Sequence, residues 1–289
     1  MTPLRQRMIE EIELRGLSPH TKKSYVRWVA DLARSRHARP DQITDEQVRE
    51  YLLHLLRERR LSASSLIVAV SALRFFYGRV MGRPTEAIEK ALPRMKKRVH
   101  RPQVYSSEEL ERLFSVKDLN RKHRAIFMTT YAAGLRVSEV CRLKIEHLLS
   151  DRGQIRVVQG KGGKDRYTLL SPRLLDELRT YWRLYRPNDW LFPSDFFPQR
   201  PLSIGTVERA FNHALEVAGL PRRGGIHTLR HTFATRLLEA GIDLVTLQRL
   251  LGHSQLSTTS TYLHVRQEHL AGINSAFDLI DFERARRSS

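Results

Sequence analysis

The chain is organised around residues 226–262, which contain Ile-His-Thr-Leu-Arg-His at 226–231, Leu-Gly-His-Ser at 251–254 and Thr-Ser-Thr-Tyr at 259–262. Apolar residues recur at helical spacing between these clusters, which predicts helices over 228–240 and 243–251. The remaining polar residues are cationic donors and a hydroxyl. Arginine matches phosphate oxygens with two parallel donors, and tyrosine can act as a covalent nucleophile. The stretch therefore suggests chemistry on an anion.

The charge balance points to a polyanionic partner. The chain has 289 residues with 50 Lys and Arg against 31 Asp and Glu, a formal net charge of +19. We find no apolar run near the ~20 residues that span a bilayer, and the N-terminus lacks the apolar core of a signal peptide. Nucleic acid is therefore a better expectation than an anionic membrane surface. The single cysteine, Cys141, excludes an intramolecular disulfide, and we expect a cytoplasmic, nucleoid-associated bacterial protein.

Residues 1–92 are predicted to form a helical domain. Ser18-Pro19 is a typical helix start, the segment 44–47 reads as a capping box, and Ser62 opens a third apolar helix. The basic residues lie off the apolar stripes, so they form either a solvated face or a DNA-facing surface. The candidate DNA-binding residues of this domain are Lys22, Lys23, Arg27 and Arg74.

Residues 93–104 have no apolar period and are predicted to be a basic linker bounded by Pro93 and Pro102. Such a linker can follow a phosphate backbone, although it can equally be a disordered solubilising segment. Its candidate DNA contacts are Lys96, Lys97 and Arg98.

The second domain is predicted over 105–289 and is mostly helical. A capping box begins at Ser106, an apolar helix covers about 122–133 and ends at Gly134, and Arg136 stands at the entrance of the next helix. Segments 154–158 and 166–170 are strand-like. The fold class expected for the whole chain is mainly α with a small antiparallel β-sheet, and the apolar tail from about 272 to 289 is expected to support oligomerisation.

The two strands flank the glycine-rich segment 160–165, which predicts a hairpin with Lys161 and Lys164 at its tip. The spacing differs from that of a nucleotide-binding P-loop, and a strand follows instead of a helix. Lysines at a hairpin tip are often only solvated, so from the residues alone a functional role stays open.

His227 and His231 are four residues apart on one helix, which invites a zinc interpretation. The metalloprotease motif needs a glutamate after the first histidine, and Thr228 stands there instead. We therefore expect no metal and no other cofactor, and we interpret His231 as a structural hydrogen-bonding residue behind the site.

Five motifs occur in a fixed order: Ala-Gly-Leu-Arg-Val-Ser-Glu at 133–139, Gly-Lys-Gly-Gly-Lys at 160–164, His-Thr-Leu-Arg-His at 227–231, Leu-Gly-His at 251–253, and Tyr262. Their order and spacing resemble those of the tyrosine recombinase (phage integrase) family, in particular its simple Xer-like or transposon-associated members. The resemblance covers essentially the whole chain, because residues 17–80 resemble the helical core-binding domain of the family. It implies a two-domain, C-shaped clamp on double-stranded DNA, without the extra N-terminal domain of some phage integrases.

The resemblance also implies catalytic roles. Tyr262 would attack the scissile phosphate and form a 3′-phosphotyrosyl link, while Arg136 and Arg230 would hold the non-bridging oxygens. His227 and His253 would donate hydrogen bonds to the same phosphate. Because the covalent link keeps the bond energy, rejoining would need neither ATP nor metal.

Three further positions are implied to assist. Lys161 would protonate the leaving 5′ oxygen, with Lys164 the less favoured choice and a DNA contact. Glu139 would orient the site.

The resulting prediction is a site-specific recombinase or integrase that acts as a homotetramer on two DNA sites through a Holliday junction. The alternatives are a type IB topoisomerase-like enzyme, which would relax DNA as a monomer, and a regulator that keeps the fold without catalysis. The sequence leaves open the DNA target, the choice among integration, excision and dimer resolution, the order of strand exchange and the need for a second recombinase or accessory protein.

Overall fold

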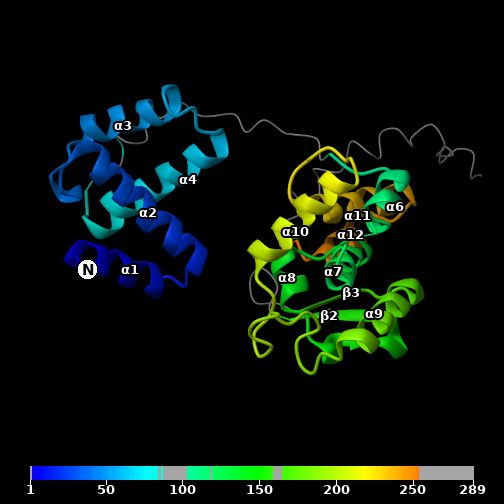
Figure 1. Cartoon of the computed structure of the whole chain (residues 1–289). Helices are drawn as coiled ribbons and strands as arrows, with labels where there is room; N and C mark the ends of the chain where they lie inside the picture. The colour runs from blue at the N-terminus through cyan, green and yellow to red at the C-terminus, as the bar shows by residue number, and fades with distance from the viewer. Residues whose placement is uncertain (1, 84–85, 87–102, 118, 159–164, 254–289) are drawn as a thin grey trace, which may run out of the picture. The chain divides into compact units, whose positions relative to one another are not determined.

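The computed structural model describes residues 2–83, 86, 103–117, 119–158 and 165–253 (Figure 1). The chain divides into two compact units, Met1–Val99 and His100–Ser289. This division falls inside the predicted linker 93–104, of which only residues 103 and 104 are among those described.

The first unit is helical, and three of its helices begin where the capping signals predicted. Ser18 Oγ accepts a hydrogen bond from the Thr21 N–H at 3.1 Å, and Thr44 forms a complete capping box with Gln47. The described elements are α1 (Pro3–Leu14), α2 (Pro19–Arg36), the 3₁₀ helix η1 (Pro40–Gln42), α3 (Asp45–Arg57), α4 (Ala63–Arg74) and the π-helix η2 (Phe75–Val80).

Helix α1 lies inside the predicted domain 1–92 but precedes Ser18, the first helix start that the sequence pattern indicated. The buried residues of α1 are Met8 and Ile12, one turn apart, and both belong to the core of the unit. Leu4, Met8 and Ile12 recur every four residues along α1, but this stripe is only three residues long, and no helix before Ser18 was predicted from it.

The span Ala63–Val80 has a mean hydropathy of 1.3 over 18 residues, which by length and composition alone is enough for a membrane-crossing helix. This differs from our expectation that no run approaches that length. The segment also contributes Leu66, Val70, Leu73 and Phe76 to the buried core of the first unit. Burial against neighbouring helices accounts for its apolar character.

The second unit joins a helical core to a small antiparallel sheet of order β1-β2-β3, as the predicted fold class required. In its register Ile155 pairs with Thr168 and Val157 with Arg166. The described elements are α6 (Ser107–Phe114), α7 (Arg121–Ala132), α8 (Val137–Cys141), η3 (Ile145–His147), β1 (Leu148–Leu149), η4 (Ser150–Arg152), β2 (Gln154–Val157), β3 (Arg166–Leu169), α9 (Pro172–Tyr185), α10 (Ile204–Val217), α11 (His227–Glu239) and α12 (Leu244–Leu251).

Helix α7 is central to this unit. It lies between α9 and the sheet on one side and α10 and α11 on the other (Figure 1). Ile126 and Phe127 are fully buried, and the Phe127 ring meets Phe211 of α10 edge to face at 5.3 Å. A smaller apolar cluster, which includes Phe233 and Leu251, packs α11 on α12. This packing brings the ends of α7, α11 and α12 together.

Gly134 ends α7 and is closely covered by α11. Its φ is +61°, and a Cβ atom there would lie 2.4 Å from two carbons of the Phe233 ring. Gly219 has nearly the same backbone, with φ +64°, but a Cβ atom there would meet no heavy atom within 4 Å. The two glycines separate the cost of a left-handed backbone from the cost of a steric clash.

Gly134→Ala is expected to lower the free energy of unfolding by about 2–5 kcal/mol, the sum of a left-handed alanine and an overpacked contact. Gly219→Ala should cost only the backbone term, about 1–2 kcal/mol. Urea unfolding of both variants measures the difference. Equal losses would contradict the close contact with Phe233.

Candidate active site

The first helical turn of α11 carries His227 and Arg230, which are three residues apart. Helix α11 begins at His227, shortly after the pair Gly224-Gly225. A Cβ atom at Gly225 would lie 2.7 Å from Glu208 Oε2, and the same carboxylate accepts a hydrogen bond from the Ile226 N–H at 3.3 Å. The glycine therefore permits a close approach that fixes the start of α11 against α10.

Arg230 is almost completely buried, with 5% of its surface exposed. Its Nη1 donates to the Gly134 carbonyl at 2.6 Å, and its Nη2 donates to the Leu251 carbonyl at 2.6 Å. The same Nη2 lies 3.1 Å from His253 Nε2. One guanidinium thus links the ends of α7 and α12, which is a use of its rigid fork that lysine could not reproduce.

Arg136 stands at the N-cap of α8, where the sequence placed it. Its backbone N–H and its Nη1 both donate to the carboxylate of Glu139, at 2.8 Å and 2.7 Å. Its Nη2 reaches the Gly252 carbonyl at 3.4 Å. Arg136 and Arg230 therefore meet at the same turn, residues 251–253.

Glu139 is the buried acid at the centre of these cations, with 7% of its side chain exposed. Arg166 donates both Nη1 and Nη2 to it at 2.8 Å each, and Arg230 Nη1 lies 3.7 Å from its Oε2. Burial alone would raise the pKa of Glu139, but the hydrogen bonds and charge of Arg166 and Arg136 outweigh it and hold that pKa at about 2. Glu139 is therefore ionised at neutral pH.

The three histidines of the motif lie in this cationic field. Burial, followed by the charges of Arg230, Arg136 and Arg166, lowers the pKa of His253 to about 4. Desolvation and the charges of Arg230 and Arg136 also lower the pKa of His227, although this residue is exposed. The pKa of His231 is lowered by burial and by neighbouring charge. All three are neutral at pH 7 and can each donate one ring N–H.

Acidification is expected to destabilise the second unit through His253. The unfolded side chain takes up its proton near pKa 6.5, whereas the folded one takes it up near 4. Between these values the unfolded chain binds more protons, so the stabilisation is complete above about pH 6.5 and is lost as the pH falls toward about 4.

His253→Gln should therefore show a smaller decrease in urea midpoint between about pH 7.5 and pH 5 than the wild-type chain. His227 and His231 supply a remaining slope of the same sign, because their pKa values are also lowered. Identical pH slopes for the two proteins would show that His253 is not the titrating group.

The structure thus brings together Arg136, Glu139, His227, Arg230, His231 and His253 from among the predicted site residues. Lys161, Lys164 and Tyr262 lie outside the described residues. Within the described ranges, no group of three or more His, Cys, Asp or Glu side chains could hold a metal ion. The basic residues predicted to bind DNA on the first unit differ in their surroundings.

Lys22 forms an ion pair with Glu13 at 2.8 Å, while Lys23, Arg27 and Arg74 are exposed. Lys96, Lys97 and Arg98 lie outside the described residues. An ion pair does not prevent a lysine from binding DNA. The presence of a lysine at position 22 can, however, be explained by its pair with Glu13 as well as by a DNA contact.

Arg166 is the site residue that the sequence pattern did not reveal. Its side chain is 9% exposed, and besides Glu139 it binds the Leu250 carbonyl through Nε at 2.9 Å. A signal was present, because residues two apart on a strand share a face and Thr168 is buried. A charged residue on that inward face indicates a buried partner.

The chain is mostly helical and gathers arginines and neutral histidines in one site, a set of donors that suits a small anion such as a phosphodiester. Comparison with known proteins gives the family. Residues 103–269 match the Phage integrase family, and residues 4–87 match the Phage integrase, N-terminal SAM-like domain.

Among relatives, an integrase/recombinase homologue from Sinorhizobium fredii is 42% identical over 280 residues, covering 97% of this chain and 90% of the relative. The tyrosine recombinase XerA of Thermococcus kodakarensis is 37% identical over 288 residues, covering 95% and 96%. A lambda integrase dimer bound to a core site shares the fold, with a TM-score of 0.73 at 20% identity over 96% of this chain and 98% of that one. The chain belongs to the phage integrase family of tyrosine recombinases, and its activity is site-specific DNA recombination.

Proposed function

We propose that this chain cleaves and rejoins DNA through a 3′-phosphotyrosyl intermediate on Tyr262, without ATP or metal. The observation that carries the proposal is the convergence of Arg136, Arg230 and His253 on one turn. Two guanidinium groups fixed in advance can stabilise the charge that develops on a phosphate in the transition state. Neutral histidines add donors without adding charge.

The remaining steps involve Tyr262 and Lys161, which lie outside the described residues, and His227, which is described. A tyrosine of pKa ~10 needs a cationic surrounding to become nucleophilic near neutral pH, which the arginines would supply. Lys161 would donate the proton that the leaving 5′ oxygen needs. His227 would assist removal of the proton from Tyr262.

A suicide substrate that traps the covalent intermediate tests this function. Wild-type protein with its cognate site should form a DNA adduct, and peptide mass spectrometry should locate the nucleotide on Tyr262. Tyr262→Phe is the negative control and should form no adduct. An adduct on another residue, or no adduct on a verified site, would refute the proposal.

We propose further that four copies assemble on two DNA sites and that the C-terminal tail of one copy docks on the next. The tail carries Ile273, Phe277, Leu279, Ile280 and Phe282, followed by three arginines. A lambda integrase tetramer bound to a Holliday junction is among the solved structures that share this fold, with a TM-score of 0.73 and 21% identity.

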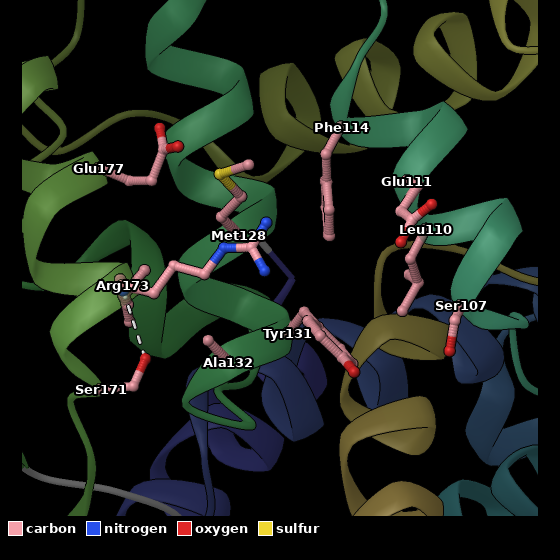
Figure 2. A pocket seen from close by; sticks show the side chains of 11 residues that line it. Ser107, Leu110, Glu111, Phe114, Met128, Tyr131, Ala132, Ser171, Arg173 and Glu177 are labelled. Carbon is pink, nitrogen blue, oxygen red and sulfur yellow. Dashed lines mark hydrogen bonds between the residues drawn. The ribbon is translucent and has the colours of Figure 1, made fainter.

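The docking site that we propose for the tail is a hollow of about 310 Å³ between α6, α7 and α9 (Figure 2). Leu110, Phe114 and Met128 supply apolar surface, and Glu111 and Glu177 lie at its edge (Figure 2). The apolar tail would fill the hollow, and the arginines that follow would pair with the carboxylates.

Deleting residues 273–289 should abolish the four-protomer complex and retain binding to a single site, as measured by sedimentation of each DNA complex. Phe114→Asp should have the same effect on assembly. Phe196→Asp is the control, because Phe196 is 88% exposed and lies outside this hollow. Normal assembly by the Phe114 variant would exclude the hollow as the docking site.

A further inference from the structure

The C-terminal end of α12 is held by three arginines, each on a different carbonyl. Arg166 binds the Leu250 carbonyl, Arg230 the Leu251 carbonyl and Arg136 the Gly252 carbonyl, at 2.9, 2.6 and 3.4 Å. The last carbonyls of a helix lack partners in its own ladder and form its negative end, so cations there are favourable. All three arginines also lie against Glu139, at 2.7–3.7 Å.

The three arginines are expected to play different parts when DNA binds. In the proposed function Arg136 and Arg230 turn donors toward the scissile phosphate, and those donors cannot at the same time bind helix carbonyls at full strength. Arg166 makes a bidentate ion pair with Glu139 and a third bond to Leu250, so each of its three nitrogens already has a protein partner. It is the member of the set suited to stay in place.

We infer that Arg166 is a positioning residue, which holds Glu139 and the end of α12 in register while Arg136 and Arg230 engage the phosphate. It acts through these groups and does not touch DNA. Gly252 supports this arrangement, because its φ is +63° and a Cβ atom there would lie 2.6 Å from Arg166 Cδ. The turn that carries His253 is therefore packed directly on the Arg166 side chain.

The inference rests on the proposed function, and its first test measures catalysis. Single-turnover adduct formation at saturating DNA should fall about 10- to 100-fold in Arg166→Met, because a displacement of about 1 Å in a reacting group has an effect of this order. DNA affinity should stay within about twofold, since Arg166 does not bind the phosphate. Arg166→Lys should not restore the rate, because lysine keeps the charge but cannot form the three bonds at once.

Arg223→Met is the matched control for a purely structural effect. Arg223 also pairs with a half-buried acid, Glu109, and covers the Tyr105 ring at 5.1 Å, but it lies outside the arginine cluster. This variant should lose stability and keep its rate per folded molecule. If Arg166→Met likewise keeps the wild-type rate per folded molecule, Arg166 is structural only and the inference is wrong.

A second readout needs no DNA and no activity. The His253 imidazole pKa, followed by NMR in the free protein, should rise toward its ordinary value in Arg166→Lys, although the charge is kept, because the turn is released. An unchanged His253 pKa in that variant would overturn the inference. If wild-type protein forms no adduct while this pKa still responds, the proposed function fails and the positioning role of Arg166 stands.

Discussion

Arg230→Lys is expected to slow covalent adduct formation by about 10²- to 10³-fold, the usual effect of removing one donor that stabilises developing charge. The native guanidinium binds the Gly134 carbonyl, the Leu251 carbonyl and His253 Nε2 from two adjacent nitrogens. An ammonium group is a single point charge on a flexible stem and cannot span the same three partners. Because Arg230→Lys keeps the positive charge, the loss of rate measures the contribution of the hydrogen-bond geometry.

Quenched single-turnover cleavage at saturating DNA measures this effect, with folding checked by circular dichroism. Arg179→Lys is the control, because Arg179 is an exposed arginine that pairs with Asp176 at 3.3 Å on the outside of α9. It should cleave at the wild-type rate. A wild-type rate for Arg230→Lys would remove Arg230 from the phosphate clamp.

Glu139→Ala is expected to lower the free energy of unfolding of the second unit by about 3–5 kcal/mol, the usual cost of removing one partner from a buried ionic cluster. The substitution leaves Arg136, Arg166 and Arg230 close together without their shared counter-charge. Glu139→Gln should lose nearly as much, because the neutral amide keeps the shape of the side chain but not its charge.

The measurement is urea unfolding followed by tryptophan fluorescence in a Trp28→Phe background, so that Trp182 and Trp190 report the second unit alone. Glu216→Ala is the matched control: its ion pair with Arg222 spans 3.7 Å and is exposed on both sides. Its loss should stay within about 0.5 kcal/mol. If Glu139→Ala also loses no more than about 0.5 kcal/mol, the three arginines do not need the carboxylate as a counter-charge.

Many of the helix starts and ends of this protein could be predicted from the local sequence. The capping residues Ser18, Thr44 and Ser106 open helices where they were predicted to, because a cap bonds the backbone two or three residues away. Gly134 and Gly252 end helices with positive φ for the same local reason. The fold class and the family were predicted correctly from the ordered motifs.

The features that could not be predicted from the sequence depend on contacts between distant segments. Helix α1 has only a short apolar stripe, and its place is set by the core that Met8 and Ile12 join. The Arg166 pair with Glu139 joins residues 27 apart, and Arg136 reaches Gly252 across 116 residues. Such pairs carry no local period or spacing, because the chain must fold before their charges meet.

From the sequence we could predict which residues would do chemistry on a phosphate, because arginine and histidine are hydrogen-bond donors and tyrosine can be a nucleophile. How the arginines and His253 are held became clear only from the folded chain. Packing of α7, α11 and α12 places three guanidinium groups on three successive carbonyls and one carboxylate. Buried charges are stable only where their partners converge, and that convergence is a property of the folded chain.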